Sequence, residues 1–213
     1  AVKEGRLKKG DTWSGKAMQP IRSTRGNVNH IFGADSTDAG TQTQTNLAGR
    51  ESVLRMLKVL KTTPGGENAS IDRMMNETAT RETFRIKGES TITVNDYQNG
   101  RKFDDALCYS FYPIDLHTKN GVVPKHLKKG VVPTIPRGSL IPKGSTNLMV
   151  AGRCLSSDRY ANSAARVQAS CMGMGQAAAC TAVLAAKSST TPKEVPLGEI
   201  HGLLREHGAI VPA

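Results

Sequence analysis

The sequence is poor in aromatic residues and lacks any long apolar run. Only 4% of its 213 residues are aromatic, which leaves little material for the stacking platforms that bind single-stranded nucleic acids. No stretch approaches the roughly 18 continuous apolar residues that a membrane-spanning helix needs. The first residues, AVKEGRLKKGDTW, contain neither an initial Met nor an apolar run of signal-peptide type. We therefore expect a soluble chain without nucleic-acid or membrane partners, and one that begins inside a longer polypeptide.

Closely spaced cysteines are also missing. The four cysteines stand at 108, 154, 171 and 180, so no two form a C-x-x-C pair, and the histidines do not have zinc-ligand spacing. Three of the four lie among apolar or small residues, where a free Cys behaves as a small hydrophobe. This pattern predicts neither a metal site nor a disulfide framework, and it leaves a pairing of Cys154 with Cys171 open.

Positive charge is present in excess. The formal net charge is +11, with Lys and Arg gathered in KEGRLKK (3–9) and KHLKK (125–129). Three interpretations are open: solvated lysines on loops, which we favour, a surface for nucleic acid or another polyanion, and an acidic part of the same polypeptide that lies outside these residues.

Periodicity predicts a mixed α and β chain. The elements that we expect are, in chain order, a short strand within 27–38, a helix over 45–61 with Leu47, Leu54, Leu57 and Leu60 on one face, a shorter helix over 69–83, strands over 84–94 and 107–117, and a loop-like stretch over 120–145 that is rich in Gly and Pro.

The stretch NLMVAG (147–152) is apolar at both odd and even positions, which is typical of a strand buried on both faces. Gly152 allows the chain to turn there, and Arg153 stands at the carboxyl edge, where ligands of open α/β sheets bind. A helix is then expected to begin near Asn162 or Ser163. One of its faces repeats small residues every four positions (Ala165, Ala169, Gly173 and Ala177). That stripe fits close packing and fits a planar cofactor equally well.

These residues carry a resemblance. NLMVAGRCLSS (147–157) and ANSAARVQASCMGMGQAAA (161–179) resemble the C-terminal, FAD-contacting segment of FAD-dependent oxidoreductases of the glutathione-reductase-like superfamily. The similarity is greatest to the family whose members read roughly NLLVAGRCIS, then Arg-Val, then Cys-Met-x-x-Gly-Gln-Ala-Ala. It extends upstream through RETFRIKGESTIT, GRKFDDAL, YPIDLH and RGSLIPKG, and so covers about residues 27–190.

The resemblance implies an α+β / α/β fold in two parts. Residues 1–134 would form a portion of the substrate domain, a sheet with helices, and residues 135–213 would add the last strand and helix of an FAD domain of the two-dinucleotide-binding type. Such enzymes open with a strand and a G-x-G-x-x-G turn that these residues do not contain. We therefore expect a C-terminal fragment whose partner is the N-terminal FAD-binding portion of the same polypeptide. FAD would be bound by the full-length protein and weakly or not at all by this chain.

The same resemblance implies site residues. The positions that match the cofactor-contacting motif are Gly152, Arg153, Ser163, Ala164, Ala165, Arg166, Val167, Met172, Gly173 and Gln176. Backbone N–H groups of Ser163–Val167 would face the pyrimidine edge of the flavin, where fixed donors stabilise negative charge. Arg166 would add charge there or form a structural ion pair.

Arg81, Tyr112 and His117 are the candidate catalytic residues, since an Arg can hold a substrate carboxylate and a His or Tyr can move a proton. A structural pairing of His117 with Asp115 is the alternative. The expected function is transfer of a hydride between a small organic substrate and FAD. The competing hypotheses are a non-catalytic binding module that keeps the substrate-domain fold without the cofactor, and a basic nucleic-acid-binding protein, for which no motif is present.

Overall fold

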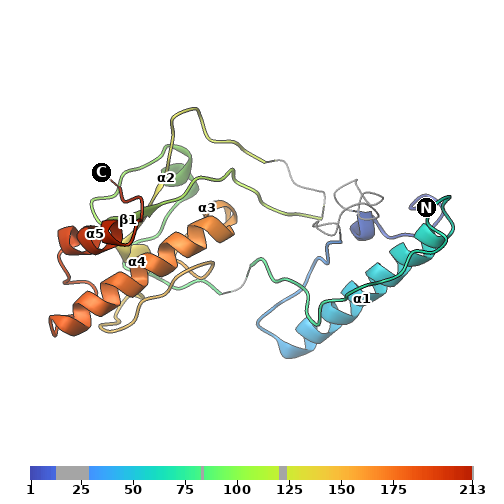
Figure 1. Cartoon of the computed structure of the whole chain (residues 1–213), viewed down its shortest axis with the longest axis horizontal. Coiled ribbons are helices and arrows are strands. Elements are labelled where there is room, and N and C mark those ends of the chain that lie inside the picture. Colours follow the sequence, from blue (N-terminus) through green and yellow to red (C-terminus); the bar gives the residue numbers. More distant parts are fainter. Residues whose placement is uncertain (13–28, 83, 120–123, 213) are drawn as a thin grey trace. The chain divides into compact units, whose positions relative to one another are not determined.

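The computed structural model describes residues 1–12, 29–82, 84–119 and 124–212 (Figure 1). The start of the short strand expected within 27–38 lies outside the described residues, and 29–38 contain no strand. The chain forms two compact units. The first comprises residues 1–80 and 118–121, and the second comprises residues 81–117 and 122–213. The division at 80/81 differs from the boundary at 134 expected between a substrate and an FAD portion, and that functional assignment stays a prediction.

The first unit is built on one long helix, α1 (Ala39–Lys61), beside a 3-10 turn, η1 (Lys9–Thr12) (Figure 1). The helix begins six residues before the expected start at 45 because Asp38 caps it. The Asp38 carboxylate accepts a hydrogen bond from the Thr41 N–H and so satisfies one of the free donors of the first turn.

The leucine face expected for this helix is not its buried face. The buried residues of α1 are Thr45, Ser52 and Val59, whereas Leu47 and Leu54 are 46% and 47% exposed. A polar contact sets this orientation. Asp11, only 2% exposed, accepts hydrogen bonds from Ser52 and from both Nε and Nη2 of Arg55, the latter two at 2.9 Å.

The second helix expected over 69–83 is absent from the described residues 69–82. Side chains of α1 take the hydrogen bonds that a helix would have made internally. Thr78 donates its N–H to the Asn46 amide oxygen at 2.8 Å, and the Asn76 carbonyl accepts from Arg50 at 3.0 Å. The segment is therefore held along α1 in an irregular conformation.

The second unit contains a two-stranded antiparallel sheet, β1 (Ala106–Tyr109) with β2 (Thr134–Pro136). A register shift between Ala106 and Cys108 leaves Leu107 as an extra residue, so that Ala106, Leu107 and Cys108 are all buried. The short helix α2 (Val94–Gln98) precedes the sheet and is closed by a capping box of Thr93 and Asp96. The 3-10 turn η3 (Arg137–Ser139) follows β2.

Three of the expected strands are shorter or missing. Residues 84–94 make only isolated bridges, Gly88 with Pro142 and Ile92 with Ser157, and β1 ends at Tyr109 rather than 117. Residues 147–152 form no strand, although the Val150 N–H donates to the Leu140 carbonyl at 2.8 Å. An apolar run becomes a ladder strand only beside another strand, and within the described residues none lies alongside 147–152.

The single helix expected from Asn162 or Ser163 is two helices, α3 (Arg159–Ala165) and α4 (Gln168–Lys187). The Asp158 carboxylate caps the start of α3 by accepting a hydrogen bond from the Ala161 N–H at 2.8 Å. The helix is then interrupted at Arg166–Val167 before α4 begins. After α4 the chain continues into α5 (Leu197–Glu206).

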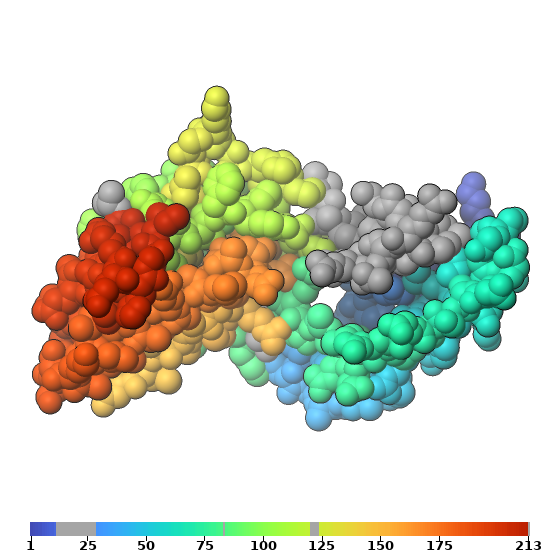
Figure 2. Space-filling model, viewed as in Figure 1, coloured from blue at the N-terminus to red at the C-terminus, as the bar shows by residue number. Residues whose placement is uncertain are grey.

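The helix α4 packs against β1 and α5, and Figure 2 shows α5 (red) lying against α4 (orange). Its buried residues are Ser170, Met174, Ala177, Cys180, Thr181 and Ala185. The small-residue stripe is therefore only partly buried, since Ala169 is exposed and Gly173 half-buried. By length and composition alone α4 could cross a membrane, but core helices meet the same criterion, and this one supplies four members of the apolar core of its unit. Together these elements make the second unit a mixed helix and sheet structure of α+β type.

Candidate site at the junction of α3 and α4

Arg166 stands at the break between α3 and α4 and joins two other segments of the second unit. Its Nη1 donates to the Arg81 carbonyl at 3.2 Å, and its Nη2 donates to the Asp115 carbonyl at 3.3 Å. The predicted ion pair of Arg166 is therefore replaced by bonds to main-chain oxygens. The break between the helices allows this arrangement, because a residue that ends one helix projects away from the axis of the next.

Asp115 extends the same cluster. Its backbone N–H donates to Ser163 Oγ at 3.1 Å, and its carboxylate pairs with His117 Nε2 at 3.0 Å. The side chains of Asp115 and His117 are only 16% and 12% exposed. The structure thus brings together Arg81, His117, Ser163 and Arg166 from the two predicted sets, and the structural pairing of His117 with Asp115 is present within that cluster.

The cluster holds two cations, Arg81 and Arg166, and the Asp115 carboxylate, and Glu82 adds a second carboxylate to its electrostatics. Burial lowers the pKa of His117, the hydrogen bond to the Asp115 carboxylate raises it, and the neighbouring Arg81 and Arg166 lower it, with a net decrease. His117 is therefore neutral near pH 7. Burial and then Arg81 also lower the pKa of Arg166, while Glu82 and Asp115 raise it, and its buried Nε has no hydrogen-bond partner among the described residues. An unsatisfied buried donor on a cation is suited to an anionic or electron-rich acceptor.

Tyr112 is 40% exposed, and its backbone is fixed by a buried tyrosine that sequence reasoning missed. The Tyr97 hydroxyl donates to the Tyr112 carbonyl at 3.1 Å and lies 3.0 Å from Ser110 Oγ, which is 2.8 Å from Ser170 Oγ. This hydroxyl row (Tyr97, Ser110, Ser170) connects α2 and the end of β1 to the first turn of α4. In the sequence, the signal for this hydroxyl row was the presence of two serines, Ser110 and Ser170, within otherwise apolar stretches.

The free backbone donors lie further along the chain than expected. Because α3 begins at Arg159, the Arg166 N–H already bonds to the Asn162 carbonyl. The helix α4 starts after Val167, which provides no side-chain cap. The first-turn N–H groups of Gln168–Ser170 have no acceptor within the helix, so they are donors at this junction as well. Contact of the Ser163–Val167 N–H groups with a flavin stays a prediction.

The turn at Gly152 lies beside the same end of α4. Gly152 has a left-handed φ of 86°, and a Cβ built there would be 3.8 Å from Cys171 Sγ. The Arg153 carbonyl accepts from the Asn162 side chain at 2.9 Å. Ala164 and Ala165, in contrast, are completely buried in the core and present no side chain to a ligand.

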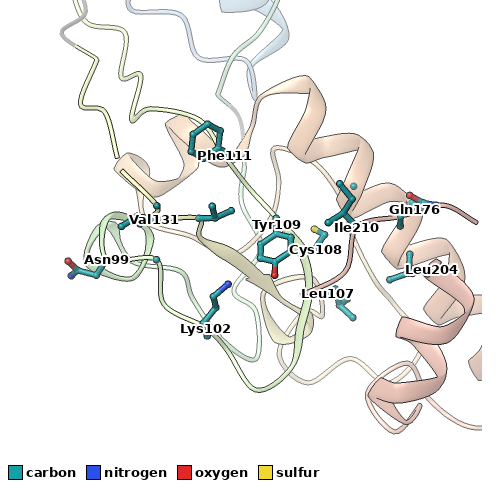
Figure 3. Close-up of a pocket in the computed structure, with 15 residues that line it drawn as sticks. Asn99, Lys102, Leu107, Cys108, Tyr109, Phe111, Val131, Gln176, Leu204 and Ile210 are labelled. Atoms are coloured by element: carbon teal, nitrogen blue, oxygen red, sulfur yellow. The ribbon is translucent and has the colours of Figure 1, made fainter. Parts of the chain in front are cut away.

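The last three predicted cofactor residues are not part of this cluster. Gly173 and Gln176 line a separate hollow next to β1 (Figure 3), and Gln176 donates to the His207 carbonyl at 3.3 Å. Met172 is 68% exposed. Contacts of these residues with a flavin ring stay a prediction.

The four cysteines are free thiols in the described part of the chain, so Cys154 and Cys171 are not paired. Among the same residues no three His, Cys, Asp or Glu side chains gather in a way that could hold a metal ion. Burial raises the pKa of Cys108 to about 12 and also raises the pKa of Cys171. A thiol with a raised pKa carries little thiolate at neutral pH and is therefore a poor nucleophile.

Comparison with known proteins assigns the chain to a family. Neither the curated proteins nor the solved structures include a match. A family model described as FAD dependent oxidoreductase, however, matches residues 3–204, which is nearly the whole chain and includes both compact units. The junction of α3 and α4 lies inside the matched region, as does the donor-rich cluster around Arg166. The chain therefore belongs to the FAD dependent oxidoreductase family.

Proposed function

We propose that this chain supplies the flavin-ring and substrate side of an oxidoreductase that transfers a hydride between a small organic substrate and FAD. The observation that carries the proposal is the half-buried Arg166. Its Nε is unsatisfied, and it lies between Arg81 and the Asp115–His117 pair at the uncapped start of α4.

The donor set fits the electron-rich edge of a flavin. The N–H groups of Gln168–Ser170 and the positive end of the α4 dipole favour negative charge, and Arg166 adds a cation. We assign these groups to the cofactor. When bound, FAD supplies the chemistry of accepting or giving a hydride at its ring.

The remaining side chains of the cluster would serve the substrate. Arg81 is suited to orient a carboxylate. His117, neutral near pH 7, can take the proton that a substrate loses when its hydride leaves. Asp115 would hold the imidazole in position through its 3.0 Å hydrogen bond, and Tyr112 would lie on the same side through the adjacent backbone.

We further propose that the ADP half of FAD is held by an N-terminal portion of the same polypeptide. That half needs a Gly-rich turn at a helix N-terminus, and these residues contain no G-x-G-x-x-G. In this proposal residues 1–134 belong to the substrate portion and 135–213 to the FAD portion.

Flavin titration tests both the flavin site at Arg166 and the proposal that the ADP half of FAD is held by another portion of the polypeptide. Purified chain should be colourless, and quenching of flavin fluorescence should give equally weak binding for FAD, FMN and riboflavin, without competition from ADP. Arg166→Gln should remove that binding, whereas Arg205→Gln, on the exposed side of α5, should not. A yellow preparation with one flavin per chain would overturn the fragment proposal. If Arg166→Gln leaves flavin binding unchanged, the assignment of the flavin to the Arg166 cluster is wrong.

A further inference from the structure

A second concave site lies in the same unit, away from the Arg166 cluster. It is an open hollow of about 840 Å³ between β1, the loop at 130–132 and the helices α4 and α5 (Figure 3). This size lies within the usual range of roughly 300–1,000 Å³ for small-molecule pockets.

The walls of the hollow are mainly apolar. Leu107 and Cys108 of β1, Val131 of the loop, and Leu204 and Ile210 from the C-terminal part face it. Ile210 is 82% exposed, an unusual state for a large aliphatic side chain beside a concave surface. Covering such a surface with an apolar body would remove it from water at a gain of about 25 cal/mol per Å².

Lys102 is the one cation among the described residues that line the hollow. Lys102 Nζ lies 4.6 Å from the centroid of the Tyr109 ring, and Figure 3 shows the two side chains directed toward each other. None of the fifteen lining residues is acidic, and among the described residues no carboxylate pairs with Lys102. The ammonium group is thus held by a ring and available to an anion.

Among the described residues of the lining, Cys108 is the only thiol, and burial raises its pKa to about 12. Gln176 already donates to the His207 carbonyl. The hollow is therefore suited to binding rather than to reaction.

From these observations we infer that the hollow binds an amphipathic carboxylate, with its apolar body against Val131 and Ile210 and its carboxylate on Lys102. The inference is independent of the flavin proposal, because it uses none of the residues of the Arg166 cluster.

The probes are decanoate and its cationic counterpart, decyltrimethylammonium, each used below its micelle concentration to displace the fluorescent anion 1-anilinonaphthalene-8-sulfonate from the purified chain. Decanoate should displace the dye and the cation should not. Lys102→Met should weaken decanoate binding about fivefold, the effect of one partly exposed ion pair. Lys143→Met, at an exposed lysine outside the hollow, is the matched control and should have no effect.

A second pair of variants keeps the test independent of folding. Because Ile210 is mostly exposed, Ile210→Asp and Ile210→Lys should both fold. The former should weaken decanoate binding and the latter should strengthen it, each by about threefold to tenfold. Equal displacement by decanoate and the cation, or affinities that ignore the charge at positions 102 and 210, would overturn the inference.

Discussion

Arg166 shows how much one side chain can organise when it stands where a helix ends. It bonds to two carbonyl groups from separate segments, Arg81 and Asp115, while its own N–H closes α3. The segments that carry Arg81 and Asp115 are therefore joined to Arg166 through main-chain carbonyls rather than through ion pairs. His117 is in turn held by the Asp115 carboxylate at 3.0 Å.

The titration of His117 follows from this arrangement. Burial, Arg81 and Arg166 lower its pKa, and Asp115 opposes them. Asp115→Asn should lower the pKa further, and Arg166→Gln should raise it. Proton NMR of the imidazole Cε1–H signal against pH measures both shifts. If neither variant changes the pKa of His117, the imidazole does not sense these neighbours.

Tyr97 offers a second test at this scale. Its hydroxyl is completely buried and bonds to Ser110 and to the Tyr112 backbone. Tyr97→Phe leaves those groups unsatisfied and should cost about 1–3 kcal/mol of unfolding free energy in urea titrations. Tyr160→Phe, at a side chain 52% exposed, should be neutral. A neutral Tyr97→Phe would show that water replaces the hydroxyl.

The types of residue at the site were easier to predict from the sequence than the residues that surround them. His117, Arg81 and Tyr112 were selected because His, Arg and Tyr can do the chemistry, and the structure places His117 and Arg81 beside Arg166. The hydroxyl row from Tyr97 to Ser170 was not predicted, because single serines give no periodic signal and their pairing depends on tertiary contacts.

Among the elements, the break between α3 and α4 is the main departure from the sequence pattern. Residues 161–179 are mostly small and contain no Pro, so periodicity predicted one helix with its start at 162 or 163. Asp158 caps the start of α3 instead, and α4 begins after Val167 without a side-chain cap. Hydrophobic period identifies a helix better than it identifies its ends.

Strands were the least predictable elements. The residues at 147–152 and 84–94 have the right composition, but a strand is defined by its partner, and composition does not reveal one. The long helix α1 was predicted, whereas its buried face was not, because Asp11 orients it through Ser52 and Arg55 and not through leucines.

Gly173 in α4 distinguishes two kinds of substitution. A Cβ at this position would lie 3.6 Å from Cys108 Cβ, an ordinary contact. Gly173→Ala should therefore be neutral or stabilise the fold by up to about 1 kcal/mol through helix propensity. Gly173→Leu should overpack against Cys108 and cost about 1–3 kcal/mol. Urea unfolding monitored by circular dichroism checks both, and equal effects of Ala and Leu would mean that this face does not pack on β1.

At the scale of the molecule, the apolar core is unequally distributed. The buried hydrophobic cluster belongs entirely to the second unit. In the described part of the first unit the only buried hydrophobic side chains are Leu7 and Val59. The first unit depends instead on the buried hydrogen bonds of Asp11.

Hydrogen exchange should reveal this difference. Amides in the buried turns of α4, around Met174 and Thr181, should exchange only on global opening of their unit. Amides of α1 should exchange faster, because few apolar contacts hold that helix. Mass spectrometry of peptic peptides resolves the two helices, and equal protection would mean that the first unit is as stable as the second.

Acid should affect the first unit through Asp11. Burial alone would raise the pKa of Asp11, but hydrogen bonds from Arg55 and Ser52 outweigh it, so the pKa is lower than the value of 3.8 in an unfolded chain. A lowered pKa contributes stability that is present above about pH 4 and is lost as the pH falls through the folded-state value. Unfolding free energy measured from pH 5 to pH 2 should fall for the native chain and stay flatter for Asp11→Asn, which should also be less stable at pH 7.

The two-residue break between α3 and α4 also makes the rotation of α4 about its own axis independent of the rotation of α3. In a continuous helix each added residue turns everything beyond it by 100°, since 3.6 residues make one turn. An insertion within α4 would therefore carry Met174, Ala177 and Thr181 out of the core. In the described residues the Arg166 N–H closes α3 and the Val167 carbonyl accepts from Cys171 of α4, but no backbone hydrogen bond crosses from α3 to α4. A change in chain length at this break can therefore be absorbed locally, and it would alter the reach of the Arg166 side chain without disturbing how α4 packs.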